Sequence, residues 1–88
     1  MDEYYKNIPK RTLETIDDYV KHGFEPGGFV RAVLENNLAL SFGAADEHNR
    51  AALFEIVQYI YSKVPNDAWG SPEIVNDWIK MIRKNNVQ

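Results

Sequence analysis

The chain of 88 residues contains no cysteine. This absence excludes disulfide bonds, zinc sites built on thiolates and cysteine nucleophiles. Histidine is scarce as well: only His22 and His48 are present, and no serine, histidine and acid arrangement or pair of catalytic carboxylates can be placed. The sequence therefore predicts a protein that is not an enzyme, with no catalytic residue, no cofactor and no metal site.

Long hydrophobic runs are missing too. The acidic Asp2 and Glu3 directly follow Met1, which does not fit a signal peptide, and no apolar run is long enough to cross a membrane. The net charge of -3 argues against a protein that binds duplex nucleic acid by neutralising phosphates. We therefore expect a cytoplasmic protein, in the host cytoplasm if a phage encodes it, with no membrane partner and no nucleic-acid partner.

The composition that remains is that of a small globular domain, with 44% hydrophobic and 26% charged residues. A chain this short forms one core of marginal stability, which favours a homo-oligomer that buries more surface. We expect residues 1–7 to be a flexible N-terminal segment and residues 8–88 to form a single helical domain. The chain shows no strand-like alternation, so the predicted fold class is all-α.

The predicted architecture is a compact bundle of four main helices, because four stretches have the apolar spacing of amphipathic helices. The sequence leaves open whether the second helix continues through Gly43 or gives way to a short extra turn there. The predicted helices run from Pro9 to His22, from Gly27 or Gly28 to about Leu38, from Asp46 to Val64, and from Ser71 to Lys84.

The start of the second helix is the most unusual local feature. A proline excludes helical backbone at Glu25, so the helix begins on Gly27 and Gly28, which have no side chain to cap the free N–H groups. These donors and the helix dipole suit an anion such as a phosphate. Two structural alternatives stay open: Glu25 folds back as the cap, or the glycines let the first helix pass close by. Since Asp46 and Ser71 can cap the later helices, this is the one start predicted to be uncapped.

Paired amides near the end of the second helix, and a tryptophan in the last loop, are further candidates for ligand contact. Asn37 follows Asn36 and falls on the inward stripe of the helix, where a buried amide needs hydrogen-bond partners. It either recognises a ligand or satisfies carbonyls or caps a neighbouring helix. Trp69 either stacks on a ring of a ligand or plugs the end of the bundle.

A second apolar row follows the third helix beside its inward stripe. Phe54 and Tyr61 form this row, so the helix either packs between helices on both sides or lends the row to another protein surface. Tyr4 and Tyr5, in the N-terminal segment, can join such a contact.

Several short motifs resemble a family of small uncharacterised proteins from bacteriophages and mobile elements. The pattern includes Pro-Gly-Gly-Phe, Ala-Val-Leu-Glu-Asn and Trp-Gly-Ser-Pro-Glu, and Asn37 departs from it because aspartate is common at that position. The resemblance implies a phage setting, in which accessory proteins often counter host defence by sequestering nucleotide messengers or by binding a defence protein. The matching segments are Ile8 to Leu13, Pro26 to Phe29, Ala32 to Asn36, Ala45 to Asn49 and Trp69 to Glu73.

Two hypotheses for function follow. In the first, an oligomer sequesters an anionic or nucleotide-like small molecule, with the phosphate held at the start of the second helix. The residues assigned to this ligand site are Arg11, His22, Gly27, Gly28, Asn36, Asn37 and Trp69.

In the second hypothesis, the protein is an interaction module that inhibits or adapts a host or phage protein, such as a host defence protein. The residues assigned to this contact are Tyr4, Tyr5, Phe54 and Tyr61.

Overall fold

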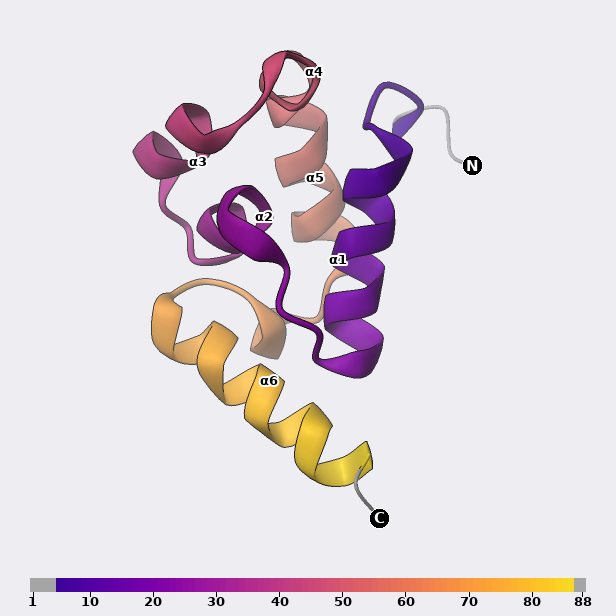
Figure 1. The fold of residues 1–88 in the computed structure, drawn as a ribbon, viewed down its shortest axis with the longest axis vertical. Coiled ribbons are helices and arrows are strands. Elements are labelled where there is room, and N and C mark those ends of the chain that lie inside the picture. Colours follow the sequence, from indigo (N-terminus) through magenta and orange to yellow (C-terminus); the bar gives the residue numbers. More distant parts are fainter. Residues whose placement is uncertain (1–4, 87–88) are drawn as a thin grey trace.

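A computed structural model describes residues 5–86, and all regular structure in that range is helical. The prediction of an all-α fold is confirmed, but the count of four main helices is wrong, because six α-helices and a short 3-10 helix are present (Figure 1). The elements are α1 (Lys10–His22), α2 (Gly27–Leu34), α3 (Leu38–Ala44), α4 (Glu47–Ala51), α5 (Leu53–Lys63), η2 (Asn66–Ala68) and α6 (Pro72–Asn86).

The helices surround one apolar core. α1 and α5 lie side by side, α6 crosses below them against α1 and η2, and α3 packs mainly on α2 at the other side of the molecule (Figure 1). Tyr19, Ile16, Leu34, Ile56, Ile60 and Val75 are the largest hydrophobic side chains that are completely buried. These residues lie on the predicted inward stripes, apart from Tyr19, which the apolar pattern did not mark.

Local end signals were predicted correctly. Gly23 ends α1 with a left-handed backbone (φ 67°), and its N–H donates to the carbonyl of Tyr19. Asp46 caps α4 by accepting a hydrogen bond from the N–H of Asn49, and the hydroxyl of Ser71 accepts one from Ile74 in the first turn of α6. Each signal needs only residues within four positions of one another.

The predicted third helix is interrupted at Ala52, which ends α4 and precedes α5. Tertiary contacts hold α4 in its own direction, since the Thr12 hydroxyl on α1 donates to the side-chain oxygen of Asn49 over 2.6 Å. Arg50 donates to the carbonyl of Ala45 and lies over the ring of Phe42, 4.7 Å from its centroid. These contacts bind α4 to α1 and α3, so the helix axis changes before α5 begins.

The second predicted helix is also shorter than expected. α2 ends at Leu34, whose carbonyl accepts a hydrogen bond of 2.7 Å from the N–H of Gly70. Asn36 then adopts a left-handed backbone (φ 65°), and Asn37 caps α3 by accepting a hydrogen bond from the N–H of Leu40. The extra turn near Gly43 is therefore a helix of its own, with Gly43 inside it.

The predicted flexible segment 1–7 is wrong at Tyr5. Its side chain is 5% exposed and belongs to the core, where its ring meets the ring of Tyr59 edge-on at 5.1 Å between centroids. A buried Tyr5 is not available to grip a partner, so its assignment to the partner contact is corrected. Tyr4, assigned to the same contact, lies outside the described residues.

Candidate functional site: the apolar face of α3 and α5

The start of α2 has the predicted glycines, and the backbone explains one of them. Gly27 has φ 84°, a conformation that residues with a Cβ atom rarely adopt. No heavy atom outside the immediate backbone lies within 4 Å of where a Cβ of Gly27 or Gly28 would stand, so the first helix does not pass close by. Both glycines therefore face open space. The backbone turn into α2 alone explains why position 27 is a glycine.

This helix start is not the only one without a capping side chain. α2 lacks a side-chain hydrogen bond at its N-cap, as predicted, but α1 begins after Pro9 and α5 after Ala52 in the same way. The contrast with the other helix starts is therefore weaker than the sequence indicated. An absent cap is a repeated feature of this fold and does not by itself mark a ligand site.

Glu25 does not fold back as a cap but pairs with Arg31. Arg31 Nη1 lies 2.8 Å from Glu25 Oε2, Nε lies 2.7 Å from Glu35 Oε2, and Nη2 donates to Asn76 on α6. Partial burial acts to lower the pKa of Arg31. The hydrogen bonds that Arg31 donates to the two glutamates, together with their negative charges, outweigh this effect and raise the pKa. The two glutamates thus already neutralise the charge of Arg31, which is a residue of α2, and this does not favour a bound phosphate.

The structure does not gather the predicted ligand residues into one site. Arg11 and His22 lie near opposite ends of α1, and eleven residues of helix separate them by about 16 Å. Arg11 lines a pocket of about 220 Å³ beside Pro26, whereas the ring of His22 lies 5.3 Å from that of Phe24. The two side chains therefore cannot hold the same phosphate.

Asn36 and Trp69 are brought together, in a small pocket of about 160 Å³ between α2, α3 and α5. The indole N–H of Trp69 is buried there with no hydrogen-bond partner. Asn37 is exposed rather than buried as predicted, because its side chain caps α3. Trp69 packs on the core and its ring meets that of Tyr61 at 6.1 Å, which is the plugging role that the sequence left open.

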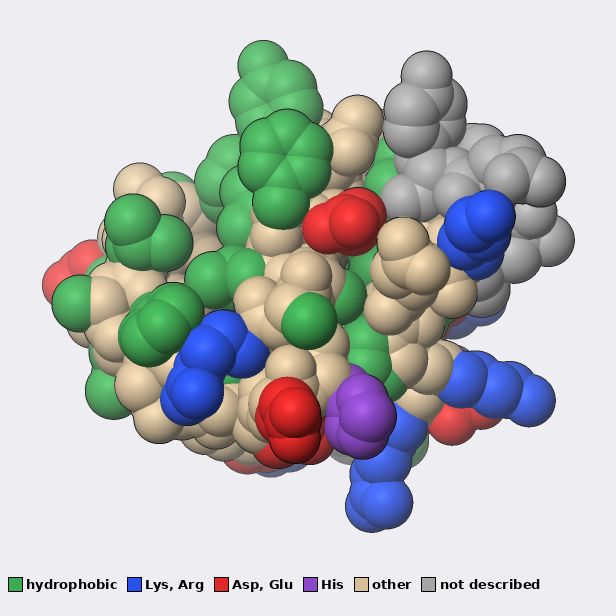
Figure 2. Space-filling model, turned by 90° about the horizontal axis from the view of Figure 1, so that it is seen from above, with side chains coloured by type: hydrophobic (Ala, Val, Ile, Leu, Met, Phe, Trp, Pro, Cys, Tyr) green, Lys and Arg blue, Asp and Glu red, His purple; other side chains and the backbone are tan. Residues whose placement is uncertain are grey.

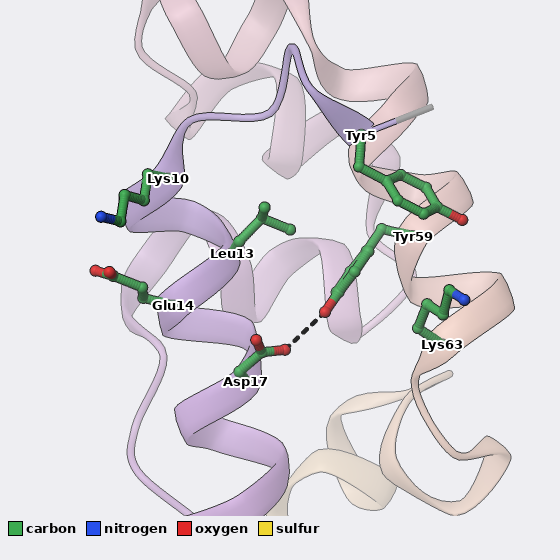
Figure 3. A pocket seen from close by; sticks show the side chains of 7 residues that line it. All are labelled: Tyr5, Lys10, Leu13, Glu14, Asp17, Tyr59 and Lys63. Carbon is green, nitrogen blue, oxygen red and sulfur yellow. Dashed lines mark hydrogen bonds between the residues drawn. The ribbon is translucent and has the colours of Figure 1, made fainter. Parts of the chain in front are cut away.

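A larger pocket, of about 520 Å³, lies between α1 and α5 and was not predicted (Figure 3). The Tyr59 hydroxyl donates to Asp17 across it over 2.7 Å, and burial, followed by this carboxylate, raises the pKa of Tyr59 to about 12. Asp17 was expected on a solvated face. No local sequence signal links it to Tyr59, because 42 positions separate the two. The pocket is lined by Tyr5, Lys10, Leu13, Glu14, Asp17, Tyr59 and Lys63.

The most extensive candidate surface is an apolar face on α3 and α5. Phe54 and Tyr61 are 79% and 73% exposed, so the second row predicted on this helix is turned to solvent. Hydrophobic side chains gather along the top and the left of the view in Figure 2, with an acidic side chain beside the upper group and a basic side chain beside the left-hand group. We define the apolar face by five exposed members: Leu38 and Phe42 on α3, and Phe54, Val57 and Tyr61 on α5. Leu40 is exposed as well, but it lies on the opposite side of α3 from Leu38 and Phe42.

Part of this face could be found from the sequence and part could not. The spacing of Phe54 and Tyr61 places both on one side of a helix. The apolar spacing placed Leu38 and Val57 on inward stripes, and this was wrong, because they are 70% and 41% exposed. Phe42 lies in an apolar stretch that fits a buried helix equally well, but α3 starts separately at its Asn37 cap and exposes it. The face therefore depends on the break between α2 and α3.

Comparison of the chain with protein-family models, with curated proteins and with solved structures gives no significant match. None of the helices within residues 5–86 is long and apolar enough to cross a membrane. In the same part of the chain, no three histidine, aspartate or glutamate side chains lie close enough together to hold a metal ion.

Proposed function

We propose that this protein is a non-catalytic interaction module that docks on another polypeptide through the apolar face of α3 and α5. The observation that carries the proposal is the exposure of five large hydrophobic side chains on neighbouring elements of a small domain. Exposed apolar patches of roughly 500 Å² are toward the upper end for monomeric proteins and mark interaction sites. The resemblance to phage and mobile-element proteins supports a host or phage protein, including a host defence protein, as the class of partner.

Two tyrosine hydroxyls serve as hydrogen-bond donors within the fold. Burial raises the pKa of Tyr19, and burial together with Asp17 raises that of Tyr59 to about 12. Each hydroxyl therefore stays protonated into alkaline solution and remains a donor: Tyr19 to the carbonyl of Ala68, and Tyr59 to Asp17.

Photo-crosslinking in living cells tests the proposal. A benzophenone amino acid in place of Phe54 keeps an aromatic group on the face, and the same amino acid in place of the exposed Lys21 on α1 is the control. We expect irradiation to produce a covalent adduct with a polypeptide from position 54 and not from position 21. No adduct from position 54, with the protein folded and present, would contradict the proposal.

The pocket between α1 and α5 favours a second candidate function, which is sequestration of an anionic or nucleotide-like ligand. Its volume of about 520 Å³ lies in the usual range for small-molecule sites. Lys10 and Lys63 can meet a phosphate and the ring of Tyr59 a base, while Glu14 and Asp17 limit the anionic charge that the pocket tolerates.

Calorimetry with cyclic and ADP-ribose-type nucleotides tests this second function. We expect Lys10→Glu combined with Lys63→Glu to abolish the heat of binding, whereas Gly28→Asp should leave it unchanged. If Gly28→Asp abolishes binding instead, the ligand lies at the start of α2 as the sequence predicted. The absence of heat at high protein concentration would rule out ligand sequestration by the purified protein.

A further inference from the structure

The strip of apolar side chains on α5 has the spacing of a helix-pairing seam. Phe54, Val57 and Tyr61 are separated by three and then four positions, which is the a and d spacing of a coiled coil. Phe54 and Tyr61 are seven residues apart, so they lie almost directly in line along the helix, about 10 Å from each other. Of the residues beside this line, Gln58 and Ser62 are uncharged, and Glu55 lies at its edge, about 100° around the helix from Phe54. One further helix can therefore lie along the strip.

We propose that this helix is α5 of a second copy of the chain, packed antiparallel about a two-fold axis. The proposal rests on the proposed function, since it names the polypeptide that covers the apolar face. The midpoint between Phe54 and Tyr61 falls beside Val57, so a two-fold axis there brings Phe54 of each copy opposite Tyr61 of the other. The two Val57 side chains then meet at the axis.

The charge on the face fits a second copy. In a two-fold contact, a charge near the axis faces the same charge of the other copy, which is unfavourable, so a self-pairing surface must be neutral there. All five members of the apolar face are uncharged. Two charged groups border them: the guanidinium of Arg50 over Phe42 on α3, and Glu55, which follows Phe54 at the edge of the strip.

The area of the face also fits. The rings of Phe42, Phe54 and Tyr61, exposed by 54%, 79% and 73%, offer roughly 400 Å² at about 200 Å² for each whole ring. The two aliphatic members raise this to roughly 500 Å². Since homodimer interfaces are about 65% apolar, such a face corresponds to about 800 Å² per copy, which is the value of a standard stable interface.

Sedimentation equilibrium with charge-swapped variants tests both the dimer and its direction. We expect the unaltered protein to have twice the monomer mass of 10.2 kDa, and Phe54→Asp and Tyr61→Lys each to weaken dimerisation by about 100-fold or more, because each change occurs in both copies. Mixing the two variants should restore a heterodimer. In an antiparallel seam, the new aspartate at position 54 of one copy faces the new lysine at position 61 of the other, and the second pair keeps Tyr61 against Phe54.

A second measurement uses the absence of cysteine. Val57→Cys is expected to form a disulfide-linked dimer under mild oxidation, because position 57 lies at the axis, whereas Lys21→Cys on α1 should remain largely monomeric. A monomeric mass for the unaltered protein at several hundred micromolar would overturn the dimer, and dimers that the charge-swapped mixture cannot restore would overturn the antiparallel register.

The outcomes separate this inference from the proposed function. A photo-adduct at position 54 with the mass of two chains supports the dimer, and an adduct with a different polypeptide, together with a monomeric mass in solution, overturns the dimer but leaves the proposed function standing. The absence of any adduct contradicts both.

Discussion

The two sides of the molecule are held together in different ways. On the side of α1, α2 and α6, hydrogen bonds join residues far apart in sequence, such as Tyr19 to Ala68, Trp78 to Val20 and Arg83 to Gly23. The hydrogen bonds of α3 that the structure shows reach no further than eight positions, and its flanks expose Leu38, Leu40 and Phe42. The first side is tied together by long-range hydrogen bonds and exposes Phe24 and Met81, whereas the second exposes a larger group of hydrophobic side chains.

This difference indicates how a chain of this length divides its hydrophobic residues. A domain of 88 residues has few large apolar side chains to place, and exposing five of them on one face lowers the stability that a monomer can reach. The buried core of α1, α2, α5 and α6 contains none of those five residues. Burying the apolar face against another polypeptide can then stabilise the complex.

A pair of tyrosines gives the largest expected contrast between the two sides. Tyr19 is fully buried and its hydroxyl donates to the carbonyl of Ala68, so Tyr19→Ala should cost about 3–5 kcal/mol and leave that carbonyl without its partner. Tyr61 is 73% exposed, so Tyr61→Ala should change the stability of the monomer by no more than about 0.5 kcal/mol. Urea denaturation of both variants at low protein concentration provides the measurement.

If Tyr19→Ala does not fold, Tyr19→Phe replaces it in the comparison, with an expected cost of about 1–2 kcal/mol for the lost hydrogen bond alone. Tyr61→Phe is the matched control and should have almost no effect. Equal losses of stability at the two positions would show that Tyr61 stabilises the monomer, and would contradict the difference between the two sides.

Two arginines give a smaller contrast of the same kind. Arg31 joins Glu25, Glu35 and Asn76, and Arg31→Gln should cost about 1–2 kcal/mol because Glu35, mostly buried, loses its charged partner. Arg50 is exposed, and Arg50→Gln should cost roughly 0.5 kcal/mol through the loss of its contact with the Phe42 ring. Thermal denaturation in low and high salt provides the measurement. The loss of stability caused by Arg31→Gln should be smaller in high salt, whereas the loss caused by Arg50→Gln should change little.

Structural features that depend on residues close in sequence could be predicted, and those that depend on residues far apart in sequence could not. Helix ends fixed by neighbouring residues, such as Gly23, Asp46 and the start at Gly27, were predicted correctly. The break at Ala52 and the end of α2 were not, because they depend on Thr12 reaching α4 and on Gly70 reaching the carbonyl of Leu34. No short window of sequence contains both partners of such contacts.

The candidate sites divide in the same way. The row of Phe54 and Tyr61 was predicted because their spacing lies within one helix, and the structure decides for exposure between the two alternatives that the sequence left open. The proposed ligand site failed as a single site because it required residues from several helices to converge, and Arg11 and His22 cannot meet along one helix. The pocket at Asp17 and Tyr59 was missed because only the packing of α1 on α5 brings these two side chains together.

Two glycines should respond in opposite directions, one on each side. Gly27→Ala should cost about 1 kcal/mol, because alanine is strained at the φ of 84° found there. Gly43 lies inside α3 without a positive φ and with no atom near a new Cβ, so Gly43→Ala should stabilise the protein by about 0.5–1 kcal/mol. Chemical denaturation measures both, and a loss at Gly43 would show that α3 needs flexibility in the free protein.

The smallest contrast concerns pH, because it develops only in alkaline solution. The folded-state pKa of Tyr59 is about 12, above the ordinary value of 10, so its contribution to stability is complete below pH 10 and is lost as the pH rises toward 12. Tyr59→Phe removes this titrating group and should flatten the fall in stability between pH 10 and 12. The remaining fall should come from Tyr19, whose pKa burial also raises. Denaturation midpoints at pH 8, 10 and 11 for the protein and this variant test the prediction, and identical slopes would mean that Tyr59 is equally accessible in the folded and unfolded chain.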